Sequence, residues 1–467
     1  MSEVRTGSAG STGTERKLGT SLKSRHITMI SIAGIIGAGL FVGSKNAIAE
    51  AGPAVILSYI MAGTLVVLVM RMLGEMATAN PDTGSFSVYA DRALGGWAGF
   101  SIGWLYWWFW VLVIPVEATA AADILTSLIG GAQWIWALAV TALLTITNLA
   151  SVGNYGEFEF WFALIKVVAI IAFIGVGVAA IFGLIPDSQV SGIDNLWQPD
   201  GFLPNGFGAV IAGMLITMFS FMGTEIVTIA AAESPNPEKG ITKAVRTVIW
   251  RISLFYIGSI FIIVSLMPYN ELPDGSYQST LQAIGIPGSK LIMDIVILTA
   301  VASCLNSALY TASRMLFSLS ERRDAPQAVR KIAGNGAPWV AVLLSTAVGF
   351  LAVIGNYLLP EKIFGYLLAT SGAVALFVYL VIAISQFVLG RKMRAAGERP
   401  PVRMWLFPYL TVVVIGLIVA VLVLMAFDPK QQQAIALSVI SAVVIVALGV
   451  FVHRRHGADA DGSIRAG

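Results

Sequence analysis

The segment Ser31-Ile-Ala-Gly-Ile-Ile-Gly-Ala-Gly-Leu-Phe-Val-Gly43 lies in the first long apolar run of the chain and carries four glycines. Each glycine disfavours a helix by about 1 kcal/mol relative to alanine. In a bilayer no water satisfies a broken backbone, so a break persists only inside protein or beside a wet cavity. Small residues that let neighbouring helices pack closely are the alternative explanation. We favour a break at Gly37-Ala38-Gly39, whose free N–H groups would face an anionic substrate group.

The composition indicates an integral membrane protein. Of the 467 residues, 12% are charged and 57% are hydrophobic, and the mean hydropathy is +0.81. A soluble domain does not need so much apolar surface, so we expect several membrane spans in a lipid bilayer. The chain has one cysteine, which excludes an intramolecular disulfide, and its three histidines lie near the chain ends. These residues give no basis for a metal site inside the membrane. The chain has no phosphate-binding Gly-x-x-x-x-Gly-Lys-Ser/Thr loop, so ATP-driven pumping is not supported. We expect no enzyme, no cofactor and no nucleic-acid partner.

Twelve apolar stretches are long enough to cross a bilayer, which predicts an all-α protein with both termini on one side. They lie at residues 27–49, 53–72, 97–127, 133–150, 157–184, 206–233, 247–267, 284–315, 336–357, 363–389, 404–427 and 432–452. We expect four parts: a disordered tail at 1–20, a transporter core at 21–390, the last two helices at 391–453 and a second tail at 454–467.

The basic residues predict the orientation. Lys166 lies inside a span, and only Lys45, Lys290, Lys362 and Lys430 lie on the side opposite the termini. The other 24 of the 29 lysines and arginines share the side of the termini. The positive-inside rule therefore predicts that both termini are cytoplasmic.

The sixth span repeats the irregularity of the first, because Phe219-Ser-Phe-Met-Gly-Thr-Glu225 interrupts an apolar run. Spans one and six would be corresponding members of two five-helix halves that enter the membrane from opposite sides. Discontinuous helices in an inverted repeat are a feature of many secondary transporters, which bind substrate at these breaks.

Three titratable residues lie deep in apolar spans: Glu117 in the third, Lys166 in the fifth and Glu225 in the sixth. Lys166 lies about ten residues, or roughly 15 Å, into its span. It could extend to the interface; if buried, desolvation favours its neutral form and makes proton exchange possible. Glu225 is predicted to bind the substrate or to take part in proton coupling, with a helix cap or an ion pair as the alternative. Glu117 is predicted to couple protons or to form an internal ion pair.

The eighth span carries a polar stripe on one helical face. In a bilayer such a stripe indicates either a wet pathway or hydrogen bonds between helices. The stripe consists of Thr299, Ser303, Asn306, Tyr310 and Ser313, with Cys304 and Ser307 beside it.

Several motifs resemble the amino-acid–polyamine–organocation superfamily, and within it the bacterial 4-aminobutyrate (GABA) permeases. These motifs are Leu22-Lys-Ser-Arg-His26, Gly37-Ala-Gly-Leu-Phe41, Glu50-Ala-Gly-Pro53, Pro81-Asp-Thr-Gly-Ser-Phe86, Tyr106-Trp-Trp-Phe-Trp-Val-Leu-Val-Ile-Pro115, Gly156-Glu-Phe-Glu-Phe-Trp161, Ile216-Thr-Met-Phe-Ser-Phe-Met-Gly223 and Ser303-Cys-Leu-Asn-Ser-Ala-Leu-Tyr-Thr-Ala-Ser-Arg314. The resemblance covers residues 20–410.

The resemblance implies a leucine-transporter-type 5+5 inverted repeat and proton-coupled uptake of GABA across the bacterial cytoplasmic membrane. A permease for an α-amino acid, such as proline or an aromatic, and a membrane nutrient sensor are the alternatives. By position, the first break matches the family's carboxylate site, and the sixth-span residues match its gate and amine site. Lys166 matches the fifth-span lysine that, in related permeases, stands where sodium-coupled relatives bind an ion. The predicted substrate-binding residues are Ile36, Gly37, Ala38, Gly39, Phe219, Ser220, Phe221, Gly223, Glu225, Ser303, Cys304 and Ser307; those for proton coupling are Lys166, Glu225 and Glu117.

Overall fold

The computed structural model describes residues 36–82, 85–150, 155–198, 200–226, 228, 236–273, 275–359, 362–427, 429 and 431–465. The side chains of residues 85, 155, 156, 158 and 455–467 are not part of this description. The expected tail at 1–20, residues 31–35 of the glycine-rich segment and residues 227 and 229–233 of the sixth span therefore lie outside the described residues.

The described residues form helices joined by turns and loops, as the apolar stretches predict. The α-helices are α2 (Ala38–Phe41), α3 (Gly43–Ala51), α4 (Val55–Ala79), α5 (Ser85–Leu94), α6 (Gly96–Ile129), α7 (Gln133–Ala150), α8 (Tyr155–Ile181), α9 (Gly206–Phe221), α11 (Pro237–Arg251), α12 (Ser259–Leu266), α13 (Ser276–Ala283), α14 (Ser289–Glu321), α15 (Trp339–Leu358), α16 (Ile363–Ala395), α17 (Tyr409–Phe427) and α18 (Gln432–Arg465). Short 3-10 turns are η1 (Gly52–Ala54), η2 (Asp194–Leu196) and η4 (Gln327–Arg330), and the π-helix η3 (Ile252–Gly258) joins α11 to α12.

Ten helical runs in the described chain are long and apolar enough to cross a membrane. One of them, Ala38–Ala79, combines α2, α3 and α4, whereas α9 is shorter than the others. Each of the twelve apolar stretches of the sequence overlaps at least one α-helix of the described chain.

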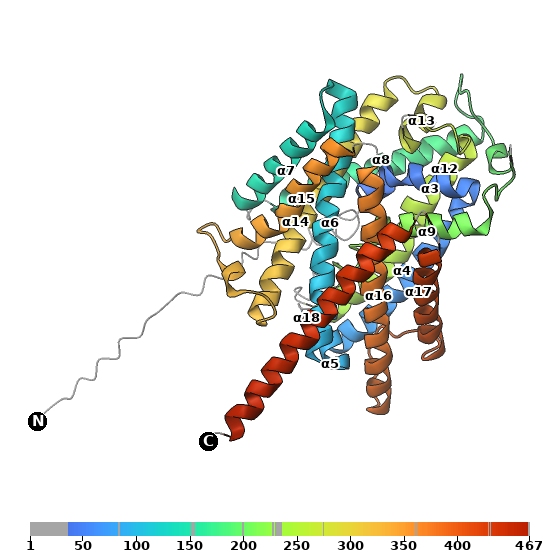
Figure 1. Cartoon of the computed structure of the whole chain (residues 1–467). Helices are drawn as coiled ribbons and strands as arrows, with labels where there is room; N and C mark the ends of the chain where they lie inside the picture. Colours follow the sequence, from blue (N-terminus) through green and yellow to red (C-terminus); the bar gives the residue numbers. More distant parts are fainter. Residues whose placement is uncertain are drawn as a thin grey trace, which may run out of the picture.

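The long helices α6 and α14 pass side by side through the middle of the bundle (Figure 1). Their buried faces carry Glu117 on α6 and Cys304 on α14. Outer helices expose apolar side chains instead: Leu424 on α17 is 47% exposed and Phe451 on α18 is 52% exposed. Apolar side chains on the outside suit contact with lipid.

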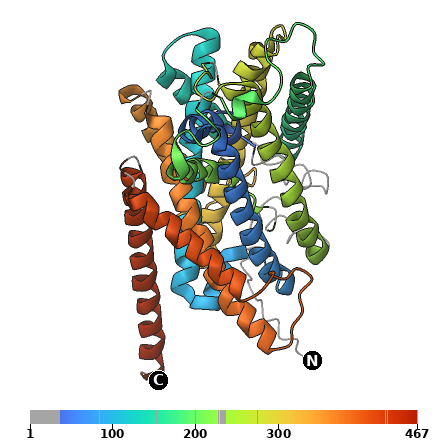
Figure 2. The same ribbon diagram turned by 90° about the vertical axis from the view of Figure 1, so that its right-hand side faces the viewer.

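The two ends of the bundle differ in charge. Helix α5 and the carboxyl ends of α16 and α18 lie at the lower end in Figures 1 and 2, whereas α13 lies at the upper end. Arg92, Arg394 and Arg454 belong to the lower set and Lys45, on α3, to the upper part. Arg251, at the end of α11, is packed inside the bundle with only 6% exposure.

Candidate functional site

The first break lies at Gly37, directly before α2. Gly37 has the non-helical angles φ −144° and ψ −146°, and the helix of only four residues begins at Ala38. Ile36, Ala38 and Leu40 are all buried, with exposures of 0–1%. The predicted carboxylate site is therefore a helix start in the protein interior.

The Glu117 carboxylate occupies the backbone donor at this break. Its two oxygens accept the N–H of Ala38 at 2.9 and 3.2 Å. Glu117 is 1% exposed and reaches the break from the middle of α6. A buried N–H group requires a partner, and hydrogen bonds to a charged group are stronger than neutral ones. This donor, which the sequence assigned to a substrate carboxylate, thus binds a carboxylate of the protein in this conformation.

The second break ends α9 at Phe221, within the interruption that the sequence predicts. Met222 is extended, with φ −64° and ψ 148°, and Gly223 has a positive φ of +94°, which favours glycine. Glu225 turns back and accepts the N–H of Gly223 with both oxygens, at 3.0 and 3.1 Å. Tyr256 donates its hydroxyl to the carbonyl of Ser220 at 2.9 Å.

The two breaks face each other across a tight contact. An added side-chain carbon on Gly39 would lie 2.8 Å from Ser220 Cα and 2.9 Å from the Phe219 ring. The Ser220 hydroxyl is buried and has no hydrogen-bond partner among the described residues. A polar atom left without a partner in the protein interior is costly, so this hydroxyl retains the capacity for a further hydrogen bond. At this contact α2 and α9 leave no room even for one added carbon atom.

Lys166 lies wholly inside the protein, in agreement with the buried alternative. Its exposure is 0%, and its Nζ atom lies 4.0 Å from Oε1 of Glu159, which is also fully buried. The same Glu159 oxygen accepts the hydroxyl of Ser303 at 2.7 Å, and Ser307 interacts with this carboxylate as well. A buried ion pair depends on such further hydrogen bonds, because both charges have lost their hydration.

The polar stripe on α14 forms hydrogen bonds to other helices at two of its positions. Ser303 bonds to Glu159 on α8, and Asn306 accepts the side-chain amide of Asn148 on α7 at 2.7 Å. Thr299 and Ser313 donate to carbonyls of their own helix. The alternative of interhelical hydrogen bonding therefore accounts for Ser303 and Asn306.

Three features of this site escape sequence reasoning: the pairing of Glu159 with Lys166, the cap that Glu117 provides to Ala38, and the role of Tyr256 at the second break. The signal for Glu159 was present in the motif Gly156-Glu-Phe-Glu. No part of the sequence pattern distinguishes a buried Glu159 from the half-buried Glu157 beside it.

Cys304 lies directly against the first break, where an added carbon on Gly37 would come 2.7 Å from its Cβ atom. We predict that a membrane-permeant maleimide abolishes transport, because the adduct fills the space between α14 and the break. Saturating substrate should slow the modification. Uptake into cells before and after labelling measures the effect, with Cys304→Ala as the insensitive control. Full activity of the stoichiometrically labelled protein would contradict this prediction.

Among the described residues, no group of three or more histidine, cysteine, aspartate or glutamate side chains is arranged to hold a metal ion.

Comparisons with known proteins agree on one family. A family model described as "Amino acid permease" matches residues 26–460. The chain is 60% identical to the gamma-aminobutyric acid permease of Escherichia coli over 94% of its length and 95% of the relative. It is 49% identical to the gamma-aminobutyric acid permease of Bacillus subtilis, over 93% and 94% of the two chains, and 43% identical to the aromatic amino acid transport protein AroP of Corynebacterium glutamicum, over 90% and 92%.

The fold is also similar to a solved structure of low sequence identity. A mutant of the manganese transporter from Eremococcus coleocola matches with a TM-score of 0.59 and 12% identity, over 94% of this chain and 98% of the other. At this identity the similarity concerns the fold alone.

Proposed function

Because this chain belongs to the amino acid permease family, we propose that it is a secondary transporter that imports GABA and short analogues with a proton. The high identity to two permeases named for gamma-aminobutyric acid supports this substrate. The structural observation that carries the proposal is the Glu117 carboxylate bound to the Ala38 N–H. A site that already binds a carboxylate of the protein has the chemistry to bind one from a substrate.

The proposed architecture has twelve spans, with α2 and α3 of the first span corresponding to α9 of the sixth in two inverted five-helix halves. Both termini would be cytoplasmic, in the bacterial cytoplasmic membrane, because the basic residues gather at one end of the bundle. The described breaks at Gly37 and Met222 support this correspondence, since helices that carry a substrate site in such repeats are discontinuous.

The substrate carboxylate would bind the backbone at Gly37-Ala38-Gly39 and displace Glu117. Two carboxylates at one N–H group repel each other, so binding is favoured when Glu117 takes up a proton or moves away. Lys166 acts electrostatically on Glu117 and Glu159. This arrangement would couple the arrival of the substrate to a change of protonation among these three residues.

The substrate ammonium would be recognised at the second break. In an α-amino acid one carbon separates the two charged groups, whereas in GABA three methylenes separate them. Selectivity would therefore come from the distance between the first break and the groups at Ser220 and Glu225. Glu225, whose oxygens bind Gly223, would either receive the ammonium or take part in proton transfer.

We predict that Glu117→Gln removes the pH dependence of GABA affinity. In the wild-type protein the anionic carboxylate competes with the substrate, so affinity rises as the pH falls and Glu117 becomes neutral. The glutamine is neutral at every pH. At alkaline pH the GABA affinity of the Glu117→Gln protein should therefore exceed that of the wild type by about tenfold, because one charged competitor for the Ala38 N–H is lost. Equilibrium binding in detergent measures this, with the exposed Glu321→Gln as the control. A wild-type pH profile in Glu117→Gln would refute the displacement model.

Uptake of labelled GABA into proteoliposomes tests the proposed function. With an imposed inward proton gradient, we expect GABA to accumulate and unlabelled GABA to compete better than proline or the aromatic amino acids. Preference for an α-amino acid would identify the alternative permease. A sensor would bind GABA but fail to exchange internal for external label in a counterflow assay.

A further inference from the structure

A second polar cluster lies far from the two breaks, where residues 396–408 connect α16 to α17. This connection folds back onto the carboxyl end of α4. Arg71 on α4 donates its Nε and Nη2 hydrogens to the carbonyl of Arg403, at 3.1 and 2.7 Å. Within the connection, the side chains of Val402 and Met404 are buried, with exposures of 5% and 4%. These contacts hold the connection in a fixed conformation.

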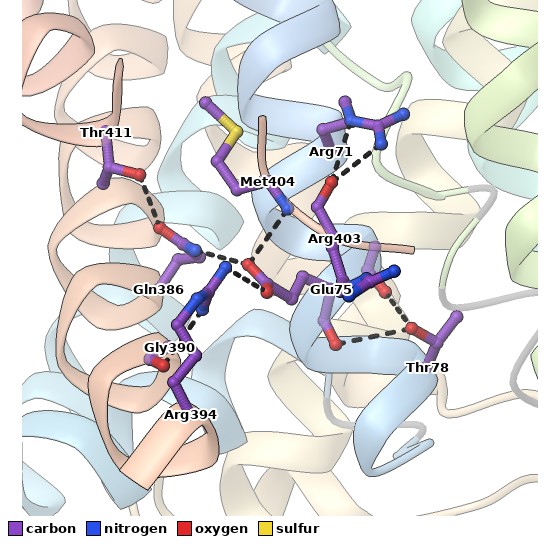
Figure 3. Close-up of polar contacts among 10 residues, drawn as sticks. Arg71, Glu75, Thr78, Gln386, Gly390, Arg394, Arg403, Met404 and Thr411 are labelled. Carbon is purple, nitrogen blue, oxygen red and sulfur yellow. Dashed lines mark hydrogen bonds and ion pairs between the residues drawn. The ribbon is translucent and has the colours of Figure 1, made fainter. Parts of the chain in front are cut away.

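Glu75 is the centre of the cluster (Figure 3). It is 1% exposed and forms an ion pair with Arg394 on α16, with Nη2 and Oε1 2.9 Å apart. Its other oxygen accepts the side-chain amide of Gln386 and the N–H of Met404. Because these partners neutralise and satisfy Glu75, its carboxylate does not compensate the other arginines of the cluster.

A cavity of about 610 Å³ opens between this cluster and the connection. That volume is in the range of small-molecule sites. Four arginines and two glutamates line it, which leaves an excess of two positive charges: Arg71, Arg394, Arg399 and Arg403, with Glu75 and Glu398. The guanidinium groups of Arg399 and Arg403 form no hydrogen bond or ion pair with the described residues.

Aromatic rings fix the two inner arginines and form an apolar rim. The Arg71 guanidinium lies 3.9 Å from the ring centre of Trp405, and that of Arg394 lies 3.7 Å from the ring centre of Phe407. Leu406 is 77% exposed at the same rim. Tyr409 follows with 78% exposure at the start of α17. Exposed aromatic residues at the end of an apolar span are typical of the bilayer interface.

We propose that this cavity binds the phosphate headgroup of an anionic phospholipid from the cytoplasmic leaflet. The arginines supply the charge and hydrogen-bond donors for the phosphate, and the rim with the exposed apolar face of α17 continues toward the acyl chains. Basic pockets between helices at the cytoplasmic surface suit anionic headgroups. Assignment to this leaflet rests on the proposed orientation, but binding to the cavity does not depend on transport.

Native mass spectrometry of the purified full-length protein, titrated with phosphatidylglycerol, tests the proposal. Arg399→Gln/Arg403→Gln should weaken the binding of phosphatidylglycerol by roughly 30-fold. Each arginine near an anionic lipid contributes to the binding free energy, and the double variant loses two of these contributions. Arg330→Gln/Lys331→Gln removes two exposed charges from the segment between α14 and α15 and should leave binding unchanged. Phosphatidylcholine should bind the wild type no better than it binds the Arg399→Gln/Arg403→Gln protein.

Three results would overturn the lipid assignment. Equal phosphatidylglycerol binding by wild type and the Arg399→Gln/Arg403→Gln protein would remove the cavity as the site. Millimolar inorganic phosphate that binds as well as the lipid, through the same arginines, would identify a site for a free anion. If the double variant fails to fold, the salt dependence of phosphatidylglycerol binding to the wild-type protein provides the test. This binding must weaken as the salt concentration rises, because salt screens the contact between arginine and phosphate. Binding that does not respond to salt would reject the phosphate contact.

Discussion

Lys166→Ala should abolish the accumulation of GABA that an imposed pH gradient drives into proteoliposomes. Lys166 is completely buried, and its Nζ atom lies 4.0 Å from Oε1 of the buried Glu159, so alanine would leave this carboxylate without its cationic partner. One proton carried with a zwitterion moves one charge, worth about 2.3 kcal/mol at 100 mV. One pH unit adds about 1.4 kcal/mol. Together these two contributions support a GABA concentration gradient of several hundred-fold. Without proton coupling, the internal and external GABA concentrations should become equal.

Two further variants locate the effect. Lys166→Arg should not restore the pH response, because arginine does not deprotonate in proteins. Lys362→Ala removes an exposed lysine that precedes α16 and should accumulate GABA as the wild type does. Counterflow, which needs no net proton movement, shows whether the Lys166→Ala protein still binds and exchanges substrate. Accumulation in Lys166→Ala that follows the imposed pH gradient would refute the assignment.

The all-helical character of the chain, the helix start after Gly37 and the end of α9 could be predicted from sequence because they follow from local composition. Apolar runs of sufficient length become helices in a bilayer, and Gly37 and Gly223 mark the points where the described helices begin or end. The depth of Lys166 in one span left two alternatives, extension to the interface or burial, and the structure shows burial. These predictions require only residue type and position along a single segment.

The partners within the site could not be predicted, because they come from distant segments. Glu117 and Ala38 are 79 positions apart, and Glu159 and Ser303 are 144 apart. Which glutamate of the pair Glu157 and Glu159 enters the core depends on the rotation of α8 about its axis. The packing of neighbouring helices fixes this rotation, and no spacing rule within one helix specifies it.

Gly39→Val should remove the binding of GABA and of every α-amino acid alike. The physical reason is the contact between α2 and α9, where a side-chain carbon on Gly39 would lie 2.8 Å from Ser220 Cα. A backbone atom cannot rotate away as a flexible side chain does, so the two helices must move apart. The shift would displace the N–H donors of the first break, and each lost hydrogen bond to a carboxylate costs about 1.5–3 kcal/mol.

Matched substitutions separate this steric effect from a general effect of valine. Gly39→Ala already introduces the clashing carbon, so most of the loss of affinity should appear with alanine and the remainder with valine. In α17, a side-chain carbon added to Gly416 would meet no atom of another part of the structure within 4 Å, so Gly416→Val should bind GABA as the wild type does. Equilibrium binding in detergent, on protein that elutes as a single monodisperse peak, gives the comparison. Because both substrate classes share the carboxylate, a loss confined to GABA would place the defect at the amine end, and wild-type affinity in Gly39→Val would exclude the first break as the carboxylate site.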